Sequence, residues 1–123
     1  MGKIENDLML YLTRKGLKPE MDKEGDIIIF YRNATFLIIC SETDFCISLP
    51  GIATIQSKRE YNKACVAANA VNSSSKYVKC IVAGDSVMLC SVHLAISLPE
   101  YNDVLFKLLD ALLNAQGVFY SMR

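Results

Sequence analysis

The sequence predicts an α+β domain in which an antiparallel sheet, made of a meander and a separate hairpin, packs with three helices. Between residues 26 and 49, apolar residues recur at every second position in three short runs separated by turn residues, a pattern typical of adjacent strands. Three other stretches carry apolar residues at helical spacing, before the meander, between it and the hairpin, and after the hairpin. The expected order is therefore α-β(3-4)-α-β2-α.

The first helix is expected from about Lys3 to Lys15. Four apolar residues make one stripe along it: Ile4, Leu8, Tyr11 and Leu12. Gly16 ends the helix and Pro19 prevents it from resuming. A short extended piece at residues 20–22 and a turn at residues 23–25 should follow, and the piece is expected to pair with the next strand as a small edge hairpin.

The meander consists of strands at residues 26–31, 35–40 and 44–49, joined by two-residue turns at Arg32-Asn33 and Glu42-Thr43. With such turns, directly opposite residues share a face. One face is almost wholly apolar and is assigned to the core: Ile27, Ile29, Tyr31, Phe36, Ile38, Cys40, Phe45, Ile47 and Leu49. The other face is mixed: Ile28, Phe30, Thr35, Leu37, Ile39, Ser41, Asp44, Cys46 and Ser48. Pro50-Gly51 is expected to break the sheet.

The second helix should begin at Ser57, because Ser57 and Glu60 have the spacing of a capping box, and it should run to about Ser73. Small apolar residues are expected on one of its sides: Tyr61, Ala64, Cys65, Ala68 and Val71. Strands at residues 77–83 and 86–96 then form a hairpin around Gly84-Asp85.

A second capping-box spacing, from Ser97 through Pro99 to Glu100, predicts the start of the third helix. This helix should extend to about Tyr120. Its wide apolar stripe is typical of a core helix: Tyr101, Val104, Leu105, Leu108, Leu109, Leu112, Ala115 and Phe119.

Composition sets the class of protein. The chain of 123 residues is 52% apolar and 21% charged, which predicts one globular domain over residues 1–123. Thirteen basic and thirteen acidic side chains cancel, so neither nucleic acid nor an anionic membrane is an expected partner. The N-terminal residues do not resemble a signal peptide, and no apolar run reaches the roughly 18 residues of a membrane helix. We therefore expect a cytoplasmic protein.

Few residues offer chemistry. His93 is the single histidine, and three positions separate it from Cys90, so a strand would point the two to opposite faces. Cys80 and Cys90 also fall on opposite faces of the second hairpin, which argues against a disulfide or a metal clip. Five cysteines without a C-x-x-C pair are expected to be free and buried. We predict no catalytic residue.

The acidic stretch around Glu20 to Gly25 fits the first half of a calcium loop. Position twelve of that loop would be Tyr31, which cannot supply the bidentate carboxylate, and the flanking residues read as strands. No phosphate-binding or hydrolase motif occurs elsewhere in the sequence. We therefore predict no metal and no cofactor.

Both faces of the second hairpin are apolar, whereas an antiparallel sheet usually leaves one face polar and in contact with water. Each face should be covered, either by helices or by a partner. The candidate protein-binding residues lie on one side of this hairpin: Tyr77, Ile81, Met88, Cys90 and Val92. The helix at residues 57–73 is the other candidate surface.

The order of elements, together with Glu24-Gly25-Asp26-Ile27 and Ala68-Asn69-Ala70-Val71-Asn72, resembles the YbjN-type domains, described as bacterial sensory transduction regulators. These are similar in fold to type III secretion chaperones, with a curved antiparallel sheet and three helices. The resemblance spans about residue 25 to the end, although Glu24 stands where aspartate is commoner. It implies a non-enzymatic regulatory or chaperone-like protein that binds other proteins as a homodimer, with Asn69 and Asn72 as structural residues near the helix end.

Two functions follow from these observations. The first is a protein-binding module that acts through an apolar sheet face, a sheet edge or helix 57–73. The alternative is a small-molecule-binding or enzymatic domain with a pocket between sheet and helices. A deep polar pocket that contains His93 or a thiol of lowered pKa would favour the alternative.

Overall fold

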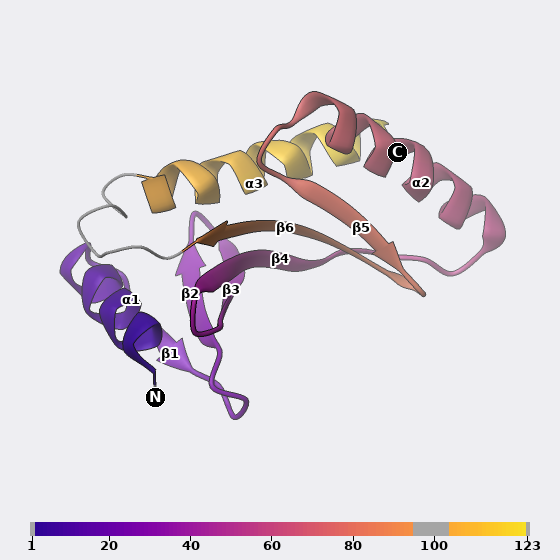
Figure 1. Ribbon diagram of the computed structural model, residues 1–123. Coiled ribbons are helices and arrows are strands. Elements are labelled where there is room, and N and C mark those ends of the chain that lie inside the picture. Colours follow the sequence, from indigo (N-terminus) through magenta and orange to yellow (C-terminus); the bar gives the residue numbers. More distant parts are fainter. Residues whose placement is uncertain (1, 95–103, 123) are drawn as a thin grey trace.

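A computed structural model describes residues 2–94 and 104–122, which form one antiparallel sheet and three helices (Figure 1). The elements follow in this order: α1 (Lys3–Arg14), β1 (Glu20–Met21), β2 (Ile27–Tyr31), β3 (Ala34–Cys40), β4 (Asp44–Thr54), α2 (Lys58–Ser74), β5 (Lys79–Ala83), β6 (Ser86–Leu94) and α3 (Val104–Met122). The strands lie in the order β1-β2-β3-β4-β6-β5, so β6 joins the hairpin to the meander. The predicted fold class is confirmed.

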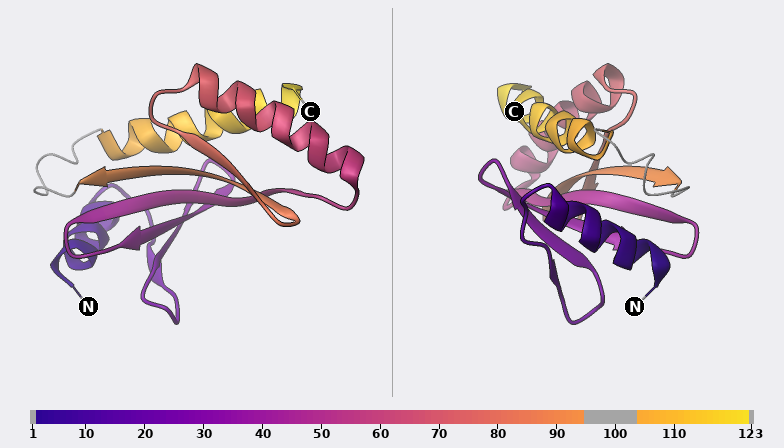
Figure 2. Two further views of the ribbon diagram at one scale, coloured as in Figure 1. Left: turned by 45° about the vertical axis from the view of Figure 1, so that its right-hand side comes forward. Right: turned by 90° about the vertical axis from the view of Figure 1, so that its left-hand side faces the viewer.

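The three helices pack against the core face of the sheet. Apolar residues of α1, α2 and α3 share one buried cluster with the core-face residues of the meander. The ring centroids of Tyr11 in α1 and Phe106 in α3 lie 6.3 Å apart, so side chains of these two helices meet at this cluster. Figure 2 shows α1 near β1 and β2, whereas α3 runs along β4 and β6, with α2 beside α3 and β5. The strongly bent sheet thus has one helix-covered face.

The turns set the register as predicted. Tyr31 pairs with Ala34 across Arg32 and Asn33, whose φ angles of 48° and 64° are those of a type I′ turn. In the next turn Cys40 pairs with Phe45, and in the last hairpin Ala83 pairs with Ser86 across Gly84 and Asp85. The face assignments that depend on these registers therefore hold in the strands.

The prediction that Pro50-Gly51 breaks the sheet is wrong. β4 continues to Thr54 through a bulge, because Leu49 pairs with Leu89 and Ala53 pairs with Val87. Residues 50–52 therefore lie opposite a single residue of β6. Both residues fit in this bulge. Pro50 has no N–H to donate to a regular ladder, and Gly51 adopts a φ of 64°.

The second helix begins as predicted but buries a slightly different side. The Ser57 hydroxyl accepts the Glu60 N–H at 3.1 Å, while the Glu60 carboxylate accepts the N–H of Gln56 at 2.6 Å, not that of Ser57. The second hydrogen bond of the capping box thus comes from Gln56, one residue before the expected donor Ser57. The buried residues of α2 are Ala64, Ala67, Ala68 and Val71, whereas Tyr61 is exposed and Cys65 is half-buried.

The third helix is described from Val104. Its buried residues follow the predicted stripe, except that Val104 itself is 47% exposed: Leu105, Leu108, Leu109, Leu112, Ala115 and Phe119. The predicted cap at residues 97–100, Tyr101 and the last predicted residues of β6 lie outside the described residues. None of the described helices is long and apolar enough to cross a lipid bilayer.

Candidate functional site: an open apolar sheet face

A row of directly paired residues crosses all six strands on the face turned away from the buried cluster. It consists of Glu20, Ile28, Leu37, Ser48, Cys90 and Lys79, in strand order from β1 to β5. We call this side of the sheet the open face. Its apolar members, together with Ser48, are Ile28, Phe30, Leu37, Ile39, Cys46, Ser48, Ile81, Met88, Cys90 and Val92. None of these residues belongs to the main buried cluster or to its half-buried border.

Large apolar side chains on the open face are in contact with solvent. Phe30 and Val92 are each 64% exposed, and Ile39 and Ile81 are 42% and 41% exposed. The uncovered face of an antiparallel sheet normally carries polar residues. A contiguous exposed apolar surface on a globular protein marks an interaction site. The open face is therefore the strongest candidate site among the described residues.

The centre of the open face contains small side chains that are nevertheless buried. Ser48 and Cys90, opposite each other on β4 and β6, are 2% and 8% exposed. The thiols of Cys46 and Cys90 are in hydrogen-bond contact across the same two strands, and burial raises the pKa of both. Both thiols therefore stay protonated at neutral pH, and they contribute apolar surface rather than charge.

The structure separates the five predicted binding residues. Ile81 and Met88 are paired across β5 and β6, and Cys90 and Val92 follow on the same face. Tyr77 lies before β5 begins, and it lines a cavity with Leu108 and Ala111 of α3 on the helix-covered side. Strand alternation does not extend to residue 77, which is why the pattern placed Tyr77 on the wrong face. That the other four bind protein remains a prediction.

Sequence reasoning assigned Phe30, Ile39 and Cys46 to the mixed face of the meander without naming them as site residues. They join the predicted residues because β4 pairs with β6, so that Cys46 lies opposite Val92. No local signal in the sequence specifies this pairing, since the two strands are separated by a helix and by β5. Their shared apolar character on one face was the only available indication.

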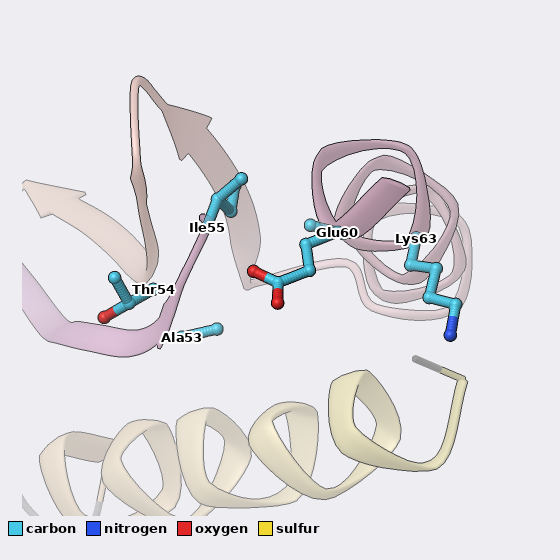
Figure 3. A pocket seen from close by; sticks show the side chains of 6 residues that line it. Ala53, Thr54, Ile55, Glu60 and Lys63 are labelled. Atoms are coloured by element: carbon cyan, nitrogen blue, oxygen red, sulfur yellow. The ribbon is translucent and has the colours of Figure 1, made fainter. Parts of the chain in front are cut away.

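A small cavity lies between the end of β4 and the start of α2 (Figure 3). Its volume is about 220 Å³, and its lining residues are Ala53, Thr54, Ile55, Glu60, Lys63 and Ala64. The Glu60 carboxylate points toward β4 and accepts the Gln56 N–H, while Lys63 extends away from it (Figure 3). Ligand pockets usually measure about 300–1,000 Å³. This cavity is smaller, and its carboxylate is already used as a cap.

The four cysteines in strands do not provide an activated nucleophile. Cys40 borders a cavity of about 420 Å³ beside the start of α1, but burial, together with Glu5, Asp26 and Asp44, raises the pKa of its thiol to about 12. Burial likewise raises the pKa of Cys80 to about 11. Nucleophilic cysteines need a lowered pKa. For His93 only the backbone is described, paired with that of Phe45.

Three carboxylates lie close together in the turn between β1 and β2, at Asp22, Glu24 and Asp26. One Asp22 oxygen accepts the N–H groups of Glu24 and Asp26 at 2.9 and 2.8 Å, an arrangement typical of an Asx turn. Burial and the two neighbouring acids raise the pKa of Asp26. Glu20, the first residue of the calcium loop considered above, lies in β1 opposite Ile28. These acids are therefore explained by the turn itself.

The molecule thus has the α+β fold of three helices and a bent antiparallel sheet found in YbjN-like proteins. The crystal structure of YbjN from Escherichia coli, described as a proposed transcription regulator, matches with a TM-score of 0.71 and 13% sequence identity, over 94% of this chain and 87% of that one. The Yersinia pestis type III secretion chaperone SycH, in complex with a stable fragment of YscM2, matches with a TM-score of 0.55 and 15% identity, over 90% and 98%.

Sequence comparison adds no closer relative. No protein-family model matches the chain, and no curated protein matches it. At 13% and 15% identity, the two structural matches establish the fold alone. They confirm the expected YbjN-like architecture.

Proposed function

We propose that this protein is a non-enzymatic, protein-binding module of regulatory or chaperone-like type, and that the open face is its contact surface. The single observation that carries the proposal is the apolar open face, with Phe30 and Val92 each 64% exposed. The two structural neighbours support it, since one is described as a regulator and the other was crystallised with a fragment of another protein. Five free cysteines favour a reducing compartment such as the cytoplasm.

The sheet edges are less suited to a partner than the face. The side chain of Asn72 accepts the Cys80 N–H at 2.7 Å and donates to the Cys80 carbonyl at 3.1 Å, so it occupies the outer edge of β5. At the other edge, β1 is only two residues long. Natural proteins protect their edge strands in such ways against strand addition. A partner is therefore expected to pack on the open face rather than to extend the sheet.

A second copy of the chain is one such partner. The row across the open face ends in Glu20 on β1 and in Lys79 on β5, with apolar and small residues between them. In an isologous dimer, a two-fold axis along the strands would place Glu20 against Lys79 of the partner subunit. The charge pattern therefore favours a homodimer in this orientation over one with the axis across the strands, which would bring like charges together.

The test is a set of three aspartate variants at exposed apolar residues. Val92→Asp alters the open face, Val66→Asp alters α2 at a side chain that is 59% exposed, and Leu10→Asp alters α1 at one that is 54% exposed. We expect Val92→Asp alone to lower the mass seen by light scattering or the recovery of proteins that co-purify from the native host. If both readouts are unchanged in Val92→Asp, the open face is not the contact surface. Loss in Val66→Asp alone would move the contact to α2.

A further inference from the structure

A second apolar surface, partly exposed to solvent, runs along α3 on the helix side of the sheet. Residues of α3 at helical spacing line two adjacent cavities of about 460 and 350 Å³: Val104, Lys107, Leu108, Ala111, Asn114, Ala115 and Val118. Both cavities include Ala111 and Tyr77, so they lie next to each other. Two buried residues of α3, Leu108 and Ala115, form the floor of these cavities, whereas the core residues Leu105 and Leu112 do not line them. Beside this floor Val104, Ala111 and Val118 recur at seven-residue spacing, and of these Val104 is exposed while Ala111 and Val118 are half-buried.

The second wall of this surface comes from the end of α2 and the connection to β5. Val71, Ser74, Ser75, Lys76 and Tyr77 line it. We call the whole feature the α3 groove. Its walls are open to solvent, since Tyr77 is 65% exposed and Val104 is 47% exposed. A small molecule would be poorly enclosed in such a groove, because drug-sized ligands are usually 70–90% buried in their sites.

The charges on the α3 groove have one sign. Lys76 and Lys107 are its two charged lining residues among the part of the chain that the structure describes. They come from opposite walls, one from the α2–β5 connection and one from α3. Among the described residues, neither lysine forms an ion pair with a carboxylate. The groove thus combines an apolar floor with two lysines that have no ion-pair partner among the described residues.

We propose that the α3 groove binds an amphipathic helix of a partner protein, with its apolar face on Val104 and Ala111 and with acidic residues beside Lys76 and Lys107. The groove spans Val104 to Val118, which at 1.5 Å per residue is about 21 Å, or four helical turns. Helix-in-groove recognition uses this length of apolar stripe. The site is separate from the open face, so it stands whether or not the open face binds protein.

The probe is a synthetic helical peptide of about 18 residues, with leucines at positions i, i+3, i+4 and i+7 and glutamates along both flanks. It is titrated into the full isotopically labelled chain, and backbone amide shifts are followed by NMR. We expect shifts confined to the α3 groove, around Tyr77, Lys107 and Ala111. A peptide with lysine in place of each glutamate should bind about tenfold more weakly, because attraction at the rim becomes repulsion.

Charge reversal on the protein completes the experiment. In the double variant Lys76→Glu/Lys107→Glu the preference should invert, so that the lysine peptide binds about tenfold more tightly than the glutamate peptide. Both lysines are exposed and form no hydrogen bond or ion pair with another described residue, so the variant should fold. Leu10→Glu on α1 is the matched control, and it should leave both affinities unchanged.

Three results would overturn the proposal. The first is the absence of shifts in the α3 groove at peptide concentrations up to about 1 mM. The second is equal affinity for the two peptides, which would indicate non-specific apolar adhesion. The third is binding of anionic phospholipid vesicles, lost in the double variant, with no binding of either peptide, which would assign the lysines to a lipid surface.

Discussion

The two faces of the sheet are built from the same strands and from similar residues, yet only one of them is buried by helices. Phe36 on β3 lies on the core face and is fully buried, whereas Phe30 on the neighbouring β2 lies on the open face and is 64% exposed. Apolar character alone therefore does not decide which residues form the core. The difference arises because the helices of the structure pack against one face, and because the other face keeps an apolar composition without such a cover.

The largest expected effect compares these two phenylalanines. Phe36→Ala should destabilise the fold by about 3–5 kcal/mol, since it removes a fully buried ring and leaves a cavity. Phe30→Ala should cost less than about 1 kcal/mol, because its ring is largely in water already. Urea unfolding followed by circular dichroism, at low protein concentration, measures both values. Equal losses would show that the open face is covered within the isolated chain.

The thiols give the next comparison, with a pH dependence. Burial raises the pKa of Cys40 and Cys80, on the covered side, to about 12 and 11, so the protonated forms dominate in the fold well above pH 9. At pH 8 their alkylation by iodoacetamide should be about 10- to 100-fold slower than in urea-unfolded chain, after allowing for the higher nucleophilicity of a more basic thiolate. The rate should still rise between pH 9 and 10.5, where that of the unfolded chain levels off.

Peptide mapping by mass spectrometry after timed quenching gives the rate for each cysteine. The unfolded chain provides the reference rate, because all five thiols are then in the same solvent. Modification of folded Cys40 at the rate of the unfolded chain would contradict the effect of its partial burial and of the neighbouring carboxylates on its pKa.

The smallest of these effects concerns the edge of the sheet. Asn72→Ala removes both hydrogen bonds to the backbone of Cys80 and should cost about 1–3 kcal/mol. Asn69→Ala, at an exposed position on the same helix, should change stability by less than about 0.5 kcal/mol. Thermal unfolding of the two variants side by side tests the difference. Equal melting temperatures for the two variants would show that the Asn72 side chain does not stabilise β5.

Most of the fold could be predicted from local sequence signals. The type I′ turn at Arg32 and Asn33 and the glycine turn at Gly84 each fix a hairpin register within a few residues, and the face assignments follow from period-two alternation. The continuation of β4 through Pro50 and Gly51 could not be read in this way. The continuation of β4 depends on its pairing with β6, whose residues lie about forty positions later in the chain. That pairing continues on both sides of the bulge.

The site was less predictable because it depends on contacts between distant segments. Periodicity showed that both faces of the last hairpin are apolar, but not which of them the helices cover. The role of Asn72 was anticipated only as that of a structural residue near the end of α2, and its actual partner, Cys80, lies eight residues further on. Tyr77 shows the same limit, because it lies two positions before β5 begins, where the alternation of a strand no longer applies.

The position of α3 has a consequence for biosynthesis. This helix provides six buried residues that cover β4 and β6, and Asp110 on it accepts the Tyr31 hydroxyl at 2.9 Å, beside the tip of the first hairpin. During translation the strands emerge from the ribosome well before α3 does. A nascent chain from which α3 has not yet emerged therefore leaves the apolar residues of β4 and β6 uncovered on both sides, a state that favours aggregation.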